Sequence, residues 1–236
     1  MRLTVIGSSP AWPNPGSAQS GYLLEGPGKL LLDCGPGVLA RLREGGHVVQ
    51  AVAITHWHLD HWGDLVPWAW LKLFGPDELR VSCTLFLPPG GIDELTRFAS
   101  FWGNERMFER AFELAEFEPG KPFEAAGFEV EARRVPHYDL EAYGFRVREP
   151  GSGHVLAYSG DCAPTQELAA LAAGANLFIC EATLADAGRD GPPRGHLTAE
   201  EAVAASDGPI LLTHRPIELP APDGLPLARD GLTLDV

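Results

Sequence analysis

The sequence lacks paired cysteines and long apolar runs. Its four cysteines, Cys34, Cys83, Cys162 and Cys180, include no Cys-x-x-Cys pair. Neither a disulfide framework nor a zinc-finger spacing is indicated, so we expect free, mostly buried thiols. No apolar stretch approaches the length of a membrane span, and the N-terminal one is too short for the core of a signal peptide. We therefore expect a cytoplasmic protein with no membrane partner.

Positive charge is also scarce. Lys and Arg together number 18, against 32 Asp and Glu, which gives a net charge of −14. A protein that grips a long phosphate backbone relies on many Lys and Arg contacts, so long nucleic acid is not the expected partner. A small anionic substrate is compatible with this charge, because bound metal ions can reverse the sign of a site locally.

Short apolar, β-branched runs alternate with helical patterns along the whole chain. The runs that predict strands cover residues 3–6, 22–24, 29–32, 49–54, 128–134, 143–148, 155–158, 177–180 and 210–212. The patterns that predict helices cover residues 38–44, 65–74, 92–101, 105–116, 165–173 and 198–205, the last opened by a capping box of Thr198 and Glu201. This order indicates one α+β domain over residues 1–236, an αββα sandwich of two sheets covered outside by helices.

The segment 92–119 is expected to be a helical, aromatic-rich insertion. Its aromatic residues are Phe98, Phe101, Trp102, Phe108, Phe112 and Phe117. Helical aromatic stripes usually form core, and a pocket lid or a subunit contact is the alternative. Four tryptophans, Trp57, Trp62, Trp68 and Trp70, are expected to pack beneath or beside the loop described next. The proline-rich stretch 216–226 is expected to follow the surface.

The run His56-Trp57-His58-Leu59-Asp60-His61 places four potential metal ligands on one loop. It follows an apolar strand and precedes a helical pattern. Three imidazoles and a carboxylate within six positions are groups that Zn²⁺ prefers. One loop cannot complete two metal shells, so further ligands are expected from other strand ends. The candidates, each at the C-terminal end of an apolar strand, are His137, Asp161 and His214.

This order of motifs resembles that of the metallo-β-lactamase superfamily, over nearly the whole chain. The resemblance implies the metallo-β-lactamase fold and a dinuclear hydrolase with two Zn²⁺ ions, although Mn²⁺ or Fe can occupy such ligands. By this resemblance the ligands of one metal are His56, His58 and His137, those of the other are Asp60, His61 and His214, and Asp161 bridges both.

Within the superfamily the chain looks closest to the ribonuclease Z and cyclic-nucleotide phosphodiesterase branch. The matching segments are Val5-Ile6-Gly7-Ser8-Ser9 with Ser20-Gly21-Tyr22, Ile179-Cys180-Glu181-Ala182-Thr183, and Gly195-His196-Leu197-Thr198. The resemblance makes a homodimer plausible and implies that His196 assists at the leaving group. Members that process transfer RNA carry a long arm between the separate His and the bridging Asp. Here only 24 residues separate His137 from Asp161, so transfer RNA 3′ processing is not expected.

We therefore expect a phosphodiesterase that acts on small or nucleotide phosphodiesters. A hydroxide bridging two zinc ions would attack phosphorus, and Asp60 would help to orient it. His196, held in orientation by Glu181, would protonate the departing oxygen. Asp60, His196 and Glu181 are the predicted catalytic residues.

Three alternatives stay open. The same fold and metals can hydrolyse thioesters, lactones or other esters, since a fold does not choose the bond that is broken. A non-catalytic metal-binding module would keep the ligands without turnover. Iron-dependent redox chemistry on the same scaffold normally goes with a carboxylate-rich ligand set, unlike the imidazole-rich set found here.

Overall fold

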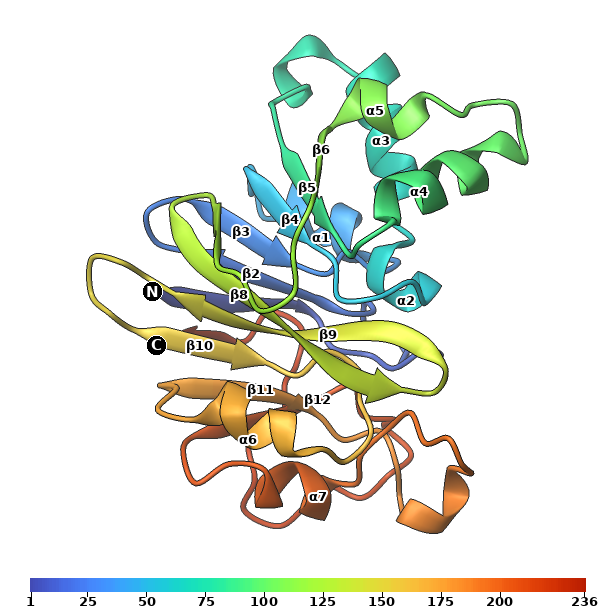
Figure 1. Ribbon diagram of the computed structural model, residues 1–236. Helices are drawn as coiled ribbons and strands as arrows, with labels where there is room; N and C mark the ends of the chain where they lie inside the picture. Colours follow the sequence, from blue (N-terminus) through green and yellow to red (C-terminus); the bar gives the residue numbers. More distant parts are fainter.

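A computed structural model describes residues 1–236, which form two β-sheets packed face to face (Figure 1). The first sheet has the order β13-β1-β2-β3-β4-β5-β6, with β1 Arg2–Gly7, β2 Gly21–Glu25, β3 Lys29–Leu32, β4 Ala51–Ala53, β5 Thr84–Leu87, β6 Glu113–Glu116 and β13 Thr233–Asp235. The second has the order β12-β11-β10-β9-β8-β7, with β7 Phe123–Ala125, β8 Phe128–His137, β9 Leu140–Arg148, β10 Val155–Tyr158, β11 Leu177–Glu181 and β12 Ile210–Thr213.

Helices cover the outer face of each sheet (Figure 1). Those over the first sheet are α1 (Val38–Glu44), α3 (Leu65–Phe74), α4 (Gly91–Ser100) and α5 (Met107–Ala111), and those over the second are α6 (Gln166–Ala172) and α7 (Ala199–Ala204). The connections hold the short α2 (Leu59–Trp62) and two 3₁₀ turns, Asp77–Leu79 and Ala187–Arg189. The predicted αββα sandwich is confirmed. No helix combines the length and apolar character needed to cross a membrane.

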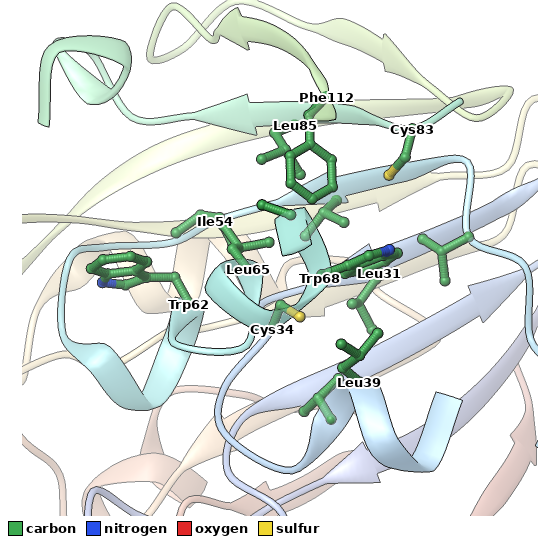
Figure 2. Packing of buried hydrophobic residues seen from close by; sticks show 14 of the residues in the cluster. Leu31, Cys34, Leu39, Ile54, Trp62, Leu65, Trp68, Cys83, Leu85 and Phe112 are labelled. Carbon is green, nitrogen blue, oxygen red and sulfur yellow. The ribbon is translucent and has the colours of Figure 1, made fainter. Parts of the chain in front are cut away.

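Three hydrophobic clusters fill the spaces between these layers. The strand β3 contributes side chains to two of them. Leu31 belongs to the outer cluster beneath α1 and α3, whereas Leu30 and Leu32 belong to the cluster between the sheets. Successive side chains of a strand point to opposite faces, so a strand buried on both faces is apolar throughout. Figure 2 shows the outer cluster, in which Trp68 of α3 lies close to Leu31.

Strand direction decides where polar residues gather. β3, β4, β5 and β6 run parallel in the first sheet, and β10, β11 and β12 run parallel in the second. β8 has the same direction as β10, because both pair antiparallel with β9. The C-terminal ends of parallel strands meet at one edge of a sheet, and loops at such edges commonly carry sites. Each sheet therefore brings its strand-end residues to one edge.

The clearest departure from prediction lies in the segment 105–116. The helix predicted there is wrong in its second half, since α5 ends at Ala111 and Glu113–Glu116 is the edge strand β6 paired with β5. Pairing with β5 overrides a local pattern that suits a helix. The strands β5, β7 and β13, of three or four residues each, were not predicted. The capping box of Thr198 and Glu201 is confirmed, as are four free, buried cysteines.

Candidate metal centre

The metal loop is the connection from β4 through α2 that carries His56, His58, Asp60 and His61. Its path is fixed by backbone contacts: the backbone N–H of Cys34 donates to the carbonyl of His61 at 2.6 Å. The indole N–H of Trp62 donates to the carbonyl of Trp57 at 3.0 Å. These bonds hold a loop on which the side chains of His56, Asp60 and His61 are buried.

The other three predicted ligands come from the second sheet. His137 is the last residue of β8, Asp161 follows β10, and His214 follows β12 directly. The loop to Asp161 needs glycine at position 160, where φ is +59° and a Cβ atom would lie 2.6 Å from the carbonyl of Tyr143. All three side chains are buried and face the metal loop.

The seven predicted ligands form two groups that share Asp161. The first group is His56, His58, His137 and Asp161, and the second is Asp60, His61, Asp161 and His214. Within each group the potential ligand atoms all lie within 4.8 Å of one another. In the first, His137 Nε2 lies 2.9 Å from His58 Nδ1. In the second, His214 Nε2 lies 3.0 Å from Asp60 Oδ2. Asp161 therefore stands where two ions would meet.

Three buried atoms in these groups have no hydrogen-bond partner: His56 Nε2, His61 Nε2 and Asp161 Oδ1. A buried polar atom without a partner is costly, and in a native structure it calls for an explanation. The donor set of imidazoles and carboxylates is the one that divalent transition metals favour. Each of the three atoms belongs to one or both of the two groups, where bound metal ions would satisfy it, so the residues present fit a metal site.

The electrostatics of the cluster also favour a cation. Burial opposes protonation of His61, but the carboxylates of Asp161, Asp33 and Asp60 outweigh it and raise its pKa well above the ordinary value. Burial likewise opposes ionisation of Asp161. The neighbouring imidazoles of His214 and His61 outweigh this effect and lower the pKa of Asp161 well below the ordinary value. Carboxylates held ionised beside imidazoles attract positive charge, and protons and metal ions compete for the same ring nitrogens.

Asp33 supports the centre and was missed by the sequence analysis. Its buried carboxylate lies 2.7 Å from Nδ1 of His61 and accepts hydrogen bonds from Thr55 and from the hydroxyl of Tyr158 at 2.9 Å. A carboxylate on one ring nitrogen fixes the tautomer and leaves the other nitrogen free for a metal. The available signal was its place directly after the apolar strand β3, the same rule that located His137 and His214.

Replacing Asp33 with asparagine is expected to weaken metal binding by roughly 10- to 100-fold, the usual effect of losing a carboxylate behind a ligating histidine. The measurement is competition with a chromophoric chelator, with circular dichroism as a check of folding. Asp64→Asn is the matched control, since Asp64 accepts from the backbone of Leu39 and contacts no histidine. If Asp33→Asn binds metal as tightly as the unchanged protein, Asp33 does not strengthen metal binding through His61.

Beside the metal ligands lies a paired acid and base. His196 Nδ1 lies 2.9 Å from Glu181 Oε1, and Asp161 Oδ2 is 3.9 Å from the same nitrogen. Burial disfavours the charged imidazole, but Glu181, Asp161 and Asp190 outweigh it and raise the pKa of His196 from 6.5 to about 9. These carboxylates thus favour the protonated form of the ring. Because Nδ1 is engaged by Glu181, Nε2 is the nitrogen left to donate.

The loop that presents His196 is held from both sides. The carboxylate of Asp190 accepts from the backbone N–H groups of Gly195 and His196 at 2.8 and 3.0 Å. The guanidinium of Arg194 donates to the carbonyl of His196 at 3.0 Å and to both carboxylate oxygens of Glu201. These contacts hold the backbone of the loop, and the bond to Glu181 orients the ring. The sequence analysis missed Asp190, which lies in a loop without a periodic pattern.

Three residues in or beside this site have strained backbone conformations. Asp33, Tyr138 and His214 have positive φ values of 59°, 49° and 53°, and Ala126 is the one other non-glycine residue with positive φ. Such conformations are unfavourable for residues with a Cβ atom and cluster at functional sites. Tyr138 also lies against two rings of the site, with ring centroids 4.9 Å from His137 and 5.6 Å from His196.

The six aromatic residues of the segment 92–119 differ in burial, and one of them, Phe98, is partly buried against the outer cluster. Phe108, Phe112 and Phe117 are buried in core clusters, as expected of most such stripes. Phe101 and Trp102 are instead exposed. Of the four tryptophans, Trp62 and Trp68 are buried in the outer cluster, Trp57 packs against that cluster, and Trp70 is partly exposed. The exposed aromatics therefore need a different explanation from the buried ones.

Comparison with known proteins identifies the family of the chain. The model of the beta-lactamase superfamily domain matches residues 29–208. An uncharacterized protein of Mycobacterium leprae is 33% identical, over 92% of this chain and 78% of that protein. A ribonuclease Z of Bradyrhizobium diazoefficiens is 27% identical, over 90% of this chain and 88% of that protein. The crystal structure of the metallo-beta-lactamase fold protein YhfI from Bacillus subtilis has a TM-score of 0.82 at 25% identity and covers 99% of each chain.

These matches confirm the predicted resemblance to the metallo-β-lactamase superfamily and to its ribonuclease Z-like branch. The matched segment 29–208 includes the metal loop and the His196 loop, and the YhfI alignment extends over almost the whole sandwich. The chain therefore belongs to the beta-lactamase superfamily.

Proposed function

We propose that this protein is a metal-dependent phosphodiesterase that acts on small or nucleotide phosphodiesters. The observation that carries the proposal is the His196–Glu181 pair beside Asp161, because it supplies a positioned proton donor next to a dinuclear site. Departure of an alkoxide from phosphorus benefits from an acid. Hydrolysis of thioesters has less need of one, since a thiolate is a more stable anion than an alkoxide.

The ligands of the two proposed ions follow the two groups of side chains. His56, His58 and His137 would hold one ion, Asp60, His61 and His214 the other, and Asp161 would bridge them. Zinc suits this imidazole-rich set, and Mn²⁺ or Fe can occupy it. Two bound ions would supply a water of lowered pKa and neutralise charge on the phosphoryl oxygens.

The chain's own residues then have separate tasks. His196 donates its Nε2 proton to the departing oxygen, and Glu181 keeps the ring oriented through Nδ1. Glu181 is itself fixed, since its carboxylate accepts from the backbone of Cys162 and from the backbone and hydroxyl of Thr183. Asp60 is buried among the proposed ligands, where its carboxylate would accept a hydrogen bond from the attacking water.

Substrate size is the second part of the proposal. The chain between His137 and Asp161 is taken up by β9 and β10, which pair within the second sheet. A protruding arm has no counterpart in that interval. Together with the net charge of −14, this favours a small phosphodiester over long nucleic acid. A relative named ribonuclease Z supports phosphodiester bonds as the class of bond.

The test is an assay of the purified protein with bis(p-nitrophenyl) phosphate and with 2′,3′- and 3′,5′-cyclic nucleotides, with added Zn²⁺ or Mn²⁺. We expect turnover that chelation abolishes and metal restores, with about two ions per chain by elemental analysis. Thioester and lactone substrates are run beside these. Turnover of thioesters or lactones alone would contradict the phosphodiesterase proposal, and metal binding without any turnover would favour a non-catalytic module.

A further inference from the structure

A groove of about 350 Å³ lies beside the metal loop and is not used by the proposed chemistry. Its seven lining residues are Trp57, Leu59, Trp62, Glu94, Arg97, Phe98 and Phe101. The first three belong to the metal loop and α2, and the others belong to α4 and the residue that ends it (Figure 1). The groove is thus formed where the insertion meets the loop that carries the ligands.

The groove adjoins the metal centre by chain connectivity. Trp57 lies between His56 and His58, and Leu59 lies between His58 and Asp60. Consecutive Cα atoms are about 3.8 Å apart, so these groove residues are immediate neighbours of the ligands. Leu59, which is 56% exposed, lies between the two, so a substituent of a molecule held at the centre would pass over Leu59 to reach the groove.

The floor of the groove is rigid and aromatic. Trp57 and Trp62 meet edge to face with centroids 5.5 Å apart, and Trp62 and Phe98 do so at 4.8 Å. The ring of Trp57 rests on Gly91, where a Cβ atom would lie 2.8 Å from it, so the absence of a side chain there permits the contact. Phe101 stands at the rim and is 82% exposed. Such walls accept the face of a flat ring.

The charge of the lining residues further limits which chemical group can occupy the groove. Glu94 and Arg97 are the charged residues of the lining, and they pair with each other, so the groove has no net charge. A neutral aromatic group fits such walls, whereas an anion would gain nothing there. The metal centre is the place for the anionic part of the same molecule. A second protein copy is less suitable, because a stable interface uses roughly 20–30 residues a side and this groove has seven.

We propose that this groove is a subsite for the nucleobase of a nucleoside phosphodiester whose phosphorus lies at the metal centre. The inference rests on the proposed function and names its substrate class. Stacking on Trp57 and Phe101 would select substrates with a base over those with a small alkyl group. The base would be recognised by its flat face rather than by hydrogen bonds, so purines and pyrimidines would both bind.

The test compares two substrates with one leaving group, thymidine 5′-(p-nitrophenyl phosphate) and methyl p-nitrophenyl phosphate. Phe101→Ala is expected to lower kcat/KM for the nucleoside ester roughly 5- to 100-fold more than for the methyl ester, mainly through KM. Phe74→Ala is the matched control, because Phe74 is 66% exposed and lies outside the groove. It should leave both substrates unchanged.

A second readout does not depend on turnover. Thymidine, which has no phosphate, is titrated into the metal-loaded protein while tryptophan fluorescence is followed. We expect thymidine to quench the fluorescence, and we expect Phe101→Ala but not Phe74→Ala to weaken this quenching. That result supports the subsite even if neither ester is hydrolysed. In that case only the proposed function fails. Equal loss on both esters, or quenching unaffected by Phe101→Ala, would overturn the subsite while the function stands. Dissociation of a dimer by Phe101→Ala without a change in substrate preference would also overturn it.

Discussion

Replacing Asp161 with asparagine is expected to lower kcat/KM for phosphodiesters roughly 10³-fold, on the scale of removing a charge-stabilising group from an active site. The physical reason is its position, since its Oδ2 atom lies 3.3 Å from His61 Nε2, 3.5 Å from His214 Nε2 and 4.0 Å from His56 Nε2. One carboxylate is thus shared by both groups of ligands. An amide keeps the shape but removes the charge that two cations require.

Metal content is the measurement that separates this prediction from a folding defect. Elemental analysis of Asp161→Asn should give clearly less metal per chain than the unchanged protein, with a native circular dichroism spectrum. Asp77→Asn is the control, because its side chain is 92% exposed and pairs only with Arg80. Full metal content together with full activity in Asp161→Asn would remove the basis for a shared bridging ligand.

Replacing His196 with alanine is expected to lower kcat roughly 10²- to 10⁴-fold for a phosphodiester with an alkoxide leaving group, the range of general acid catalysis. A substrate that releases p-nitrophenolate needs little protonation, so its loss should be less than about tenfold. The metal content should not change, since His196 is not among the seven proposed ligands. Comparing the two leaving groups in one variant provides the internal control.

The same residue predicts a pH profile. Its pKa is raised from 6.5 to about 9, so the acid form that donates the proton is present below that pH. The rate with an alkoxide substrate should therefore fall as the pH rises through about 9, and His196→Ala should lose this alkaline limb. A Glu181→Gln variant removes the nearest negative charge and should move the limb to lower pH. If the alkaline limb has the same pKa in both variants, it is caused by a group other than His196.

Much of the fold followed from periodicity. The predicted boundaries of α1, α3 and β3 agree with the structure, because each segment has a strong apolar pattern bounded by Gly, Pro or Asp. Three of the four strands at the ends of the sheets, β6, β7 and β13, were not predicted. β13 has three residues and β6 resembles a helix locally, so both depend on pairing with a strand distant in sequence, which single-sequence patterns do not report.

The ligand residues could be located because each follows an apolar strand, a rule that needs no tertiary contact. Their mutual distances could not, since they depend on the direction of β8 and β10 in one sheet and β4 in the other. Supporting residues were harder to find. Asp190 acts through backbone N–H groups in an irregular loop, and nothing in its local sequence distinguishes it from a surface aspartate.

β13 has a consequence for how the molecule avoids self-association. It pairs with β1, which would otherwise end the first sheet with unpaired N–H and C=O groups beside the apolar side chains of Leu3 and Val5. Such an edge is a template for strand addition and amyloid-like growth. The proline-rich stretch 216–226 connects β12 to the segment that contains β13. With β13 paired to β1, the edge of the sheet is the short, partly charged β13, which is a poorer template for strand addition than β1. β13 thus replaces a six-residue edge with a three-residue one, which leaves less backbone for another chain to pair with.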